Sequence, residues 1–107
     1  MGLIAFVVAA GALANLGAIA QQHGILLFSD EVYRESEYDP AERLPAGCDL
    51  NPDAISLGVM SKTYGLAGLR IGWLATRDDG LLRGLAAFKD YTTICNSAPS
   101  EFLATLA

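Results

Sequence analysis

The sequence predicts an α/β fold, in which a mostly parallel sheet lies between helices as part of a three-layer sandwich. Three observations support this class. A helical repeat of apolar residues ends at Gly24, and a run that is apolar at every position follows at 25–28. A second, mostly apolar run lies at 54–59, and an amphipathic pattern lies at 81–89. Strands without polar alternation are typical of sheets that are covered by helices on both faces.

The first expected helix contains a leucine, isoleucine and alanine repeat from Leu13 to Ala20, followed by three polar residues. Gly24 then stands where a glycine commonly closes a helix, because glycine adopts the left-handed backbone conformation at little cost. The first strand, 25–28, comes directly after it. Helix, glycine and buried strand together indicate an α/β unit.

The middle of the chain is expected to be a surface loop followed by a second buried strand. The segment 34–53 contains three prolines and several acids, which favour a loop with one helical turn. The strand at 54–59 resumes the apolar pattern. Its end leads to a lysine, Lys62.

The C-terminal part is predicted to hold a third strand and two helices. The strand covers 71–76 and leads into a turn at 77–80. The segment 81–89 carries apolar residues on one helical face. After a break, Ser100 is expected to cap a last helix at 101–107.

Composition excludes several classes of protein. More than half of the 107 residues are apolar, which excludes a disordered chain, and a net charge of -5 argues against a nucleic-acid partner. Cys48 and Cys95 stand far apart and outside any metal-ligand spacing, so we expect a reduced, cytoplasmic protein. No metal site is predicted, because the acids of the 34–53 loop and Glu31 are interpreted as a solvated group.

The N-terminal segment is unusual because no charged side chain occurs before Asp30. A signal peptide and a membrane helix are the two alternatives for such a segment. No basic residue precedes the apolar run, and Asn15 with several glycines interrupts it, so a membrane partner is not expected. We expect residues 1–12 to be a divergent apolar segment and residues 13–107 to carry the fold.

Polar side chains gather where two of the predicted strands end. Asp30 and Tyr33 follow the first strand, and Ser61 and Lys62 follow the second. Arg70 stands eight residues beyond Lys62. Ligands of open α/β sheets bind outside the carboxyl ends of the strands. We therefore expect these side chains to face one site.

The two segments that carry these residues resemble the signature segments of class I/II, fold-type I pyridoxal-phosphate-dependent aminotransferases. They read Ser-Asp-Glu-Val-Tyr at 29–33 and Ser-Lys-Thr-Tyr-Gly-Leu-Ala-Gly-Leu-Arg-Ile-Gly-Trp at 61–73. The resemblance implies that residues 13–107 form part of the large, cofactor-binding domain of that fold. It also implies pyridoxal 5'-phosphate as cofactor, amino-acid and 2-oxo-acid substrates, and a homodimer.

The resemblance assigns one role to each site residue. Lys62 is the expected Schiff-base lysine, since an amine attacks an aldehyde and then carries a proton, whereas a guanidinium does not. Asp30 is expected to pair with the pyridine nitrogen, and Tyr33 to hydrogen-bond the ring oxygen. Arg70 is the expected phosphate anchor because its planar fork binds phosphate oxygens bidentately, and Ser61 adds a hydroxyl.

Parts of the family pattern are missing from this sequence. Val59 replaces a hydroxyl or amide that helps to hold the phosphate in many relatives, and the arginine that grips the substrate carboxylate has no counterpart. The resemblance thus predicts a truncated aminotransferase that is inactive alone, and whether the chain is itself an enzyme stays open. Two alternatives stay open beside it. One is another fold-type I enzyme, such as a carbon–sulfur lyase or an amino-acid synthase, and the other is a non-catalytic interaction module.

Overall fold

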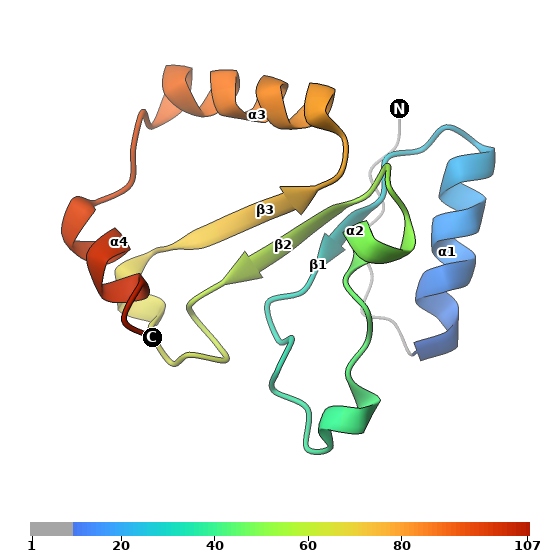
Figure 1. Ribbon diagram of the computed structural model, residues 1–107, viewed down its shortest axis with the longest axis horizontal. Helices are drawn as coiled ribbons and strands as arrows, with labels where there is room; N and C mark the ends of the chain where they lie inside the picture. Colours follow the sequence, from blue (N-terminus) through green and yellow to red (C-terminus); the bar gives the residue numbers. More distant parts are fainter. Residues whose placement is uncertain (1–9) are drawn as a thin grey trace.

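The structure of the chain is a computed structural model, and it describes residues 10–107. Three strands form a sheet in the order β1-β2-β3, with helices beside it (Figure 1). The predicted α/β class is confirmed. The elements in chain order are α1 (Ala10–Gln22), β1 (Phe28–Asp30), a 3-10 turn (Pro40–Glu42), α2 (Gly47–Leu50), β2 (Ile55–Val59), a second 3-10 turn (Ala67–Leu69), β3 (Gly72–Thr76), α3 (Asp79–Thr92) and α4 (Ala98–Ala104).

The sheet is mixed. β1 and β2 are parallel, with Phe28 opposite Ile55, whereas β2 and β3 are antiparallel, with Val59 opposite Gly72. The link between β2 and β3 holds only a short 3-10 turn. A parallel partner is usually reached by a crossover through an α-helix, and no α-helix lies between β2 and β3, so this link returns the chain in the opposite direction.

The end of α1 is closed by Gly24, as predicted. Gly24 has a φ of 61°, and its N–H donates to the carbonyl of Gln21 at 3.2 Å. The N–H of Ile25 donates to the carbonyl of Ala20 at 2.8 Å. These two bonds form a Schellman motif, which satisfies carbonyls that the last helical turn leaves free.

The first strand begins later than the sequence predicts. We expected it at 25–28, but β1 covers Phe28–Asp30. Ile25 closes the preceding helix, so its N–H is not available to the sheet. Asp30 consequently occupies the last position of the strand instead of the loop beyond it.

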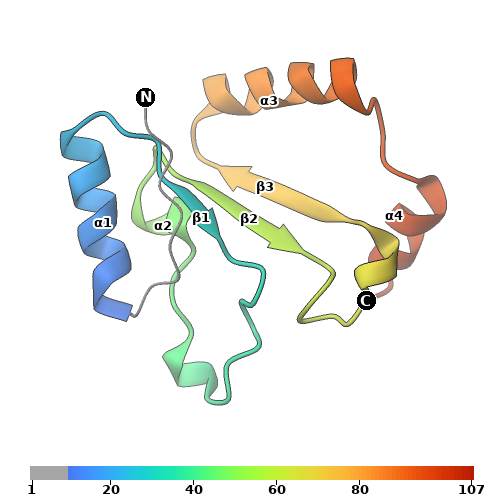
Figure 2. The same cartoon turned by 180° about the vertical axis from the view of Figure 1, so that it is seen from behind.

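The hydrophobic core lies between α1 and the start of the parallel strands. Its members are Leu13, Ala20, Leu27 and Ala54, with Ile25 and Leu44 packed against them. No residue from 61 to 107 is buried, and the apolar side chains of α3 are largely exposed. Figure 2 shows α1 and α3 on opposite sides of the sheet.

The last helix begins three residues earlier than expected. Ser97, and not Ser100, is the N-cap of α4, and Pro99 lies in the first turn. Proline is tolerated there because the N–H that it lacks has no partner within the helix. Across residues 10–107, none of the helices combines the length and the apolar character needed to cross a bilayer. The predicted boundary after residue 12 falls inside α1, and residues 1–9 lie outside the described part, so the division of the chain stays a prediction.

Candidate functional site

The candidate site lies where the parallel strands β1 and β2 end. Asp30 is in register with Leu57, so both strands deliver the chain to the same edge of the sheet. The segments that follow, 33–36 and 62–64, contact each other through side chains. This edge is where open α/β sheets bind their ligands.

The structure brings together Lys62 and Tyr33, two predicted site residues that follow different strands. The Lys62 Nζ atom lies 5.6 Å from the centroid of the Tyr33 ring. At this distance an ammonium group is attracted by the electrons of an aromatic face. Both side chains remain open to solvent, so the amine is accessible to a small molecule.

Asp30 and Tyr33 line one cavity of about 270 Å³ beside the loop that follows β1. Leu13 and Leu44 supply part of its apolar wall. Asp30 is exposed, and its Oδ1 atom accepts a hydrogen bond from the Val32 N–H at 3.2 Å. One carboxylate oxygen therefore stays free to pair with a protonated ligand atom.

The side chains of Ser61 and Arg70 form no polar contact with the other predicted site residues in the described part of the chain. Ser61 follows β2 and is half-buried. Arg70 ends a 3-10 turn with a φ of 55°, and its Nη1 atom donates to the carbonyl of Ala67 at 3.2 Å. Within residues 10–107, no hydrogen bond or ion pair connects either residue to Asp30, Tyr33 or Lys62.

A group of contacts that the sequence did not indicate joins the two segments beyond the strands. The Thr63 hydroxyl donates to the carbonyl of Arg34 and lies 3.1 Å from the Ser36 hydroxyl. The Tyr64 hydroxyl donates to Glu35 Oε2 at 3.2 Å. We call these residues, 34–36 and 63–64, the loop clasp.

The loop clasp contains an unusual backbone conformation at Glu35. Its φ is 72°, a region that side chains other than glycine seldom adopt. The Glu35 N–H donates to Glu37 Oε1 at 3.1 Å, and Arg43 Nη1 lies 3.3 Å from Glu35 Oε1. Hydrogen bonds from the backbone N–H groups of Glu37 and Glu35, together with Arg43, hold the pKa of Glu37 below its ordinary value of 4.5.

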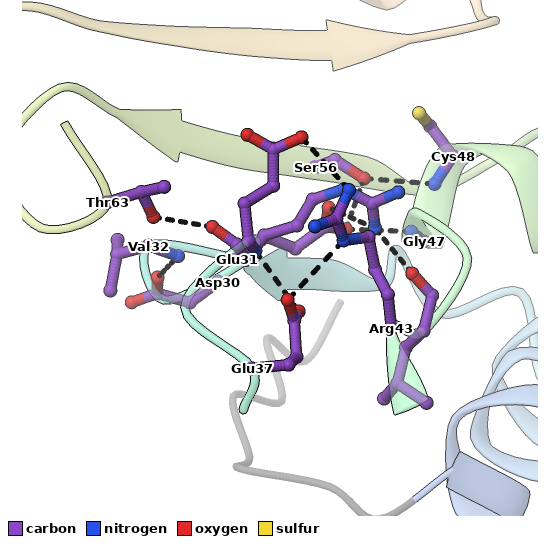
Figure 3. A network of polar contacts seen from close by, with 12 residues as sticks. Asp30, Glu31, Val32, Glu37, Arg43, Gly47, Cys48, Ser56 and Thr63 are labelled. Carbon is purple, nitrogen blue, oxygen red and sulfur yellow. Dashed lines mark hydrogen bonds and ion pairs between the residues drawn. The ribbon is translucent and has the colours of Figure 1, made fainter. Parts of the chain in front are cut away.

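Glu31 anchors the loop after β1 to the sheet (Figure 3). Its Oε1 atom accepts from the Gly47 N–H and from the Ser56 hydroxyl, both at 2.7 Å. Arg34 lies 3.8 Å from Glu31 Oε2, and the Cys48 N–H donates to the Ser56 hydroxyl at 3.0 Å. Only 13% of the Glu31 side chain is exposed. The expectation that Glu31 belongs to a solvated acidic group is therefore wrong.

Sequence reasoning missed Glu31 because its partners are remote along the chain. Gly47 is 16 residues away and Ser56 is 25 residues away. No local pattern distinguishes Glu31 from the exposed acids that follow it. In the described range, no group of three or more His, Cys, Asp or Glu side chains is arranged to hold a metal ion.

The arrangement offers three kinds of chemistry at one edge of the sheet. The Lys62 amine can act as a nucleophile toward a carbonyl carbon and can accept or donate a proton. The Tyr33 hydroxyl can donate a hydrogen bond to a ligand oxygen. The Asp30 carboxylate can stabilise a positive charge on a ligand nitrogen.

Comparison with known proteins gives consistent results. The family model for aminotransferase class I and II matches residues 6–107. Glutamate-pyruvate aminotransferase AlaA of Escherichia coli is 32% identical over 96 residues, which cover 83% of this chain and 23% of that protein. Capreomycidine synthase of Streptomyces vinaceus is 33% identical over 92 residues, 86% of this chain and 23% of the relative.

A solved structure matches along the whole chain. The PLP-dependent aminotransferase from Streptococcus suis superposes with a TM-score of 0.86 at 30% identity, and covers 100% of this chain and 30% of the larger one. The chain thus spans about a quarter of the length of the curated relatives that it matches.

Proposed function

The chain belongs to the class I and II aminotransferase family, and we propose that its site at the ends of β1 and β2 binds pyridoxal 5'-phosphate for amino-group transfer. The observation that carries this proposal is the Lys62 amine 5.6 Å from the Tyr33 ring, which itself lines a cavity with Asp30. The substrates of the reaction are an amino acid and a 2-oxo acid.

The donor set fits this cofactor. Pyridoxal phosphate presents an aldehyde, a ring oxygen, a ring nitrogen and a phosphate. The site supplies an amine, a phenol and a carboxylate, and Arg70, which lies apart from these three groups, supplies a guanidinium. When bound, the cofactor withdraws electrons from the substrate α-carbon. Lys62 would hold the cofactor at its aldehyde carbon and would move the α-proton, and Tyr33 would donate to the ring oxygen. Asp30 would keep the ring nitrogen protonated.

The phosphate is proposed to lie against Arg70 and Ser61. A guanidinium has five N–H donors, and one of those of Arg70 is used by the Ala67 carbonyl. The others are free to bind phosphate oxygens once the exposed side chain turns toward the cavity. This anchor has to reorient on binding, whereas Lys62 and Tyr33 are already adjacent, so we expect weak cofactor binding.

We further propose that these 107 residues do not catalyse turnover by themselves. The family's arginine for the substrate carboxylate has no counterpart in the sequence, and Val59 offers the phosphate no hydrogen bond. A homodimer and a cytoplasmic location belong to the same proposal. The homodimer rests on the family, and the cytoplasmic location rests also on two separate free cysteines, Cys48 and Cys95.

A second candidate function uses the same residues for a different product. The similarity to a capreomycidine synthase favours an amino-acid synthase, because proton transfer by Lys62 at an activated α-carbon also serves condensation and elimination. Analysis of the products formed by a longer chain that contains this segment distinguishes the two reactions.

The chain contains only two lysines, which permits a sharp test of cofactor attachment. The purified protein is incubated with pyridoxal phosphate and reduced with borohydride, and the added mass is located by peptide mass spectrometry. We expect the label at Lys62 and little at Lys89, whose Nζ atom donates to Thr93 and Asn96. Lys62→Ala should abolish the selective label, and Lys89→Ala should leave it unchanged.

Two outcomes contradict the proposal. Equal labelling of both lysines would indicate that Lys62 has no special environment. Absence of any label would favour the non-catalytic interaction module.

A further inference from the structure

We propose that Thr63 is a positioning residue, which holds the Lys62 amine beside the Tyr33 ring through its hydrogen bond to the carbonyl of Arg34. This inference rests on the proposed function for the role of Lys62, but its geometric part does not. Thr63 is the residue after Lys62, and Arg34 is the residue after Tyr33. One hydrogen bond therefore joins the direct neighbours of the two side chains that must meet.

The Thr63 hydroxyl has a single proton, and it takes part in two hydrogen bonds, one as donor and one as acceptor. The hydroxyl donates that proton to the Arg34 carbonyl, so the Ser36 hydroxyl at 3.1 Å acts as donor to Thr63. The side chain thus links two residues of the loop after β1 at once. Consecutive Cα atoms lie about 3.8 Å apart, so fixing Thr63 also fixes the origin of the Lys62 side chain.

The partner of Thr63 is itself held in place. The Arg34 N–H donates to the carbonyl of Glu31 at 2.9 Å, and Arg34 Nη1 donates to the carbonyl of Leu44 at 2.6 Å. Glu31 is anchored to the sheet through Ser56. The Arg34 carbonyl is therefore a fixed acceptor, and the bond from Thr63 transmits this rigidity to Lys62.

The backbone at Glu35 supports the same interpretation. A φ of 72° at a glutamate persists only where surrounding contacts stabilise it. Tyr64 and Arg43 both contact its carboxylate, at 3.2 Å and 3.3 Å. This turn directly follows the Arg34 carbonyl that accepts from Thr63. Backbone strain of this kind is concentrated at functional sites, and here it lies within the loop clasp.

The loss of the hydroxyl can be tested without loss of volume. Thr63→Val keeps the shape of the side chain but removes the hydroxyl. The Arg34 carbonyl then loses the hydrogen bond that Thr63 donates. Thr63→Ser restores the donor. Thr92→Val is the matched control, because the Thr92 hydroxyl bonds only to the carbonyls of Phe88 and Lys89 in its own helix.

The first measurement uses NMR on the full chain without cofactor. We expect a nuclear Overhauser effect between the Lys62 ε-methylene protons and the Tyr33 ring protons in the unmodified protein. Thr63→Val should lose this signal, Thr63→Ser should recover it, and Thr92→Val should retain it. Recovery by serine separates the role of the hydroxyl from a general loss of packing.

The second measurement is the borohydride labelling ratio of Lys62 to Lys89. Thr63→Val should lower this ratio roughly three- to tenfold, as expected for the loss of one hydrogen bond. The two measurements separate the two proposals. If the NMR signal behaves as expected but Lys62 is not labelled in any variant, the cofactor proposal fails and the positioning contact stands.

The positioning role is overturned by any of three results. Absence of the Lys62–Tyr33 signal in the unmodified protein means that the two side chains do not meet. Retention of the signal and of the labelling ratio in Thr63→Val means that the hydroxyl is not required. Failure of Thr63→Ser to restore the signal means that the effect is not due to the hydroxyl.

Discussion

Residues 10–60 and residues 61–107 differ in how they are packed. Every buried residue that the structure describes belongs to the first part, including Leu27 and Ala54 at 7% and 0% exposed. In the second part Phe88 is 67% exposed and Phe102 is 64% exposed. Asp30 and Tyr33 therefore stand on a segment attached to a core, whereas Lys62 stands at the start of a segment without one.

The difference shows how the candidate site depends on polar contacts. α3 carries an apolar face, but in Figure 1 it extends along β3 away from α1 and the core. The hydrophobic effect consequently stabilises this region little. What ties Lys62 to the packed part is the loop clasp, through Thr63 and Tyr64. Hydrogen bonds are directional, so they fix a side chain in a way that apolar contact alone does not.

The largest expected contrast is between two leucines. Leu27→Ala removes a side chain from the core and should lower the free energy of unfolding by about 2–4 kcal/mol. Leu106 is 69% exposed, and Leu106→Ala should change the free energy of unfolding by less than about 0.5 kcal/mol. Urea denaturation followed by circular dichroism measures both. Equal effects would mean that the two parts are packed alike.

A smaller contrast is expected between two glutamates. Glu31→Gln replaces charge-assisted hydrogen bonds to Gly47 and Ser56 by neutral ones, and should cost about 1–2 kcal/mol. Glu101 accepts a similar bond from Asn96, but at an exposed position. Glu101→Gln should have an effect near zero on the same denaturation curve. A neutral result for Glu31→Gln would contradict its role as an anchor.

The smallest expected effect is a stabilisation at Gly84 in α3. An added Cβ meets no atom within 4 Å there, so Gly84→Ala should raise the free energy of unfolding by about 0.5–1 kcal/mol through helix propensity. Gly58 in β2 is the opposite case. A Cβ there would overlap with the Trp73 ring, so Gly58→Ala should destabilise. If both substitutions changed the free energy of unfolding in the same direction, the proposed difference in packing between residues 10–60 and residues 61–107 would be contradicted.

Much of the fold was predictable because its signals are local. The repeat in α1 and the closing glycine Gly24 follow from spacing and backbone preference. The start of β1 was not predictable in this way, because Ile25 is apolar like a strand residue but serves the helix end. The cap of α4 was misplaced because Ser97 and Ser100 both suit an N-cap, and Pro99 is compatible with the first.

The sequence by itself determined the order of the main elements, the two segments that identify the family, and the residues that we propose carry chemistry. These features depend on neighbours in the chain. The tertiary structure alone decided that β3 runs antiparallel, that Glu31 is anchored, and that Lys62 meets Tyr33 while Arg70 does not. Each of these depends on groups that are distant in sequence and become neighbours only when the strands pair.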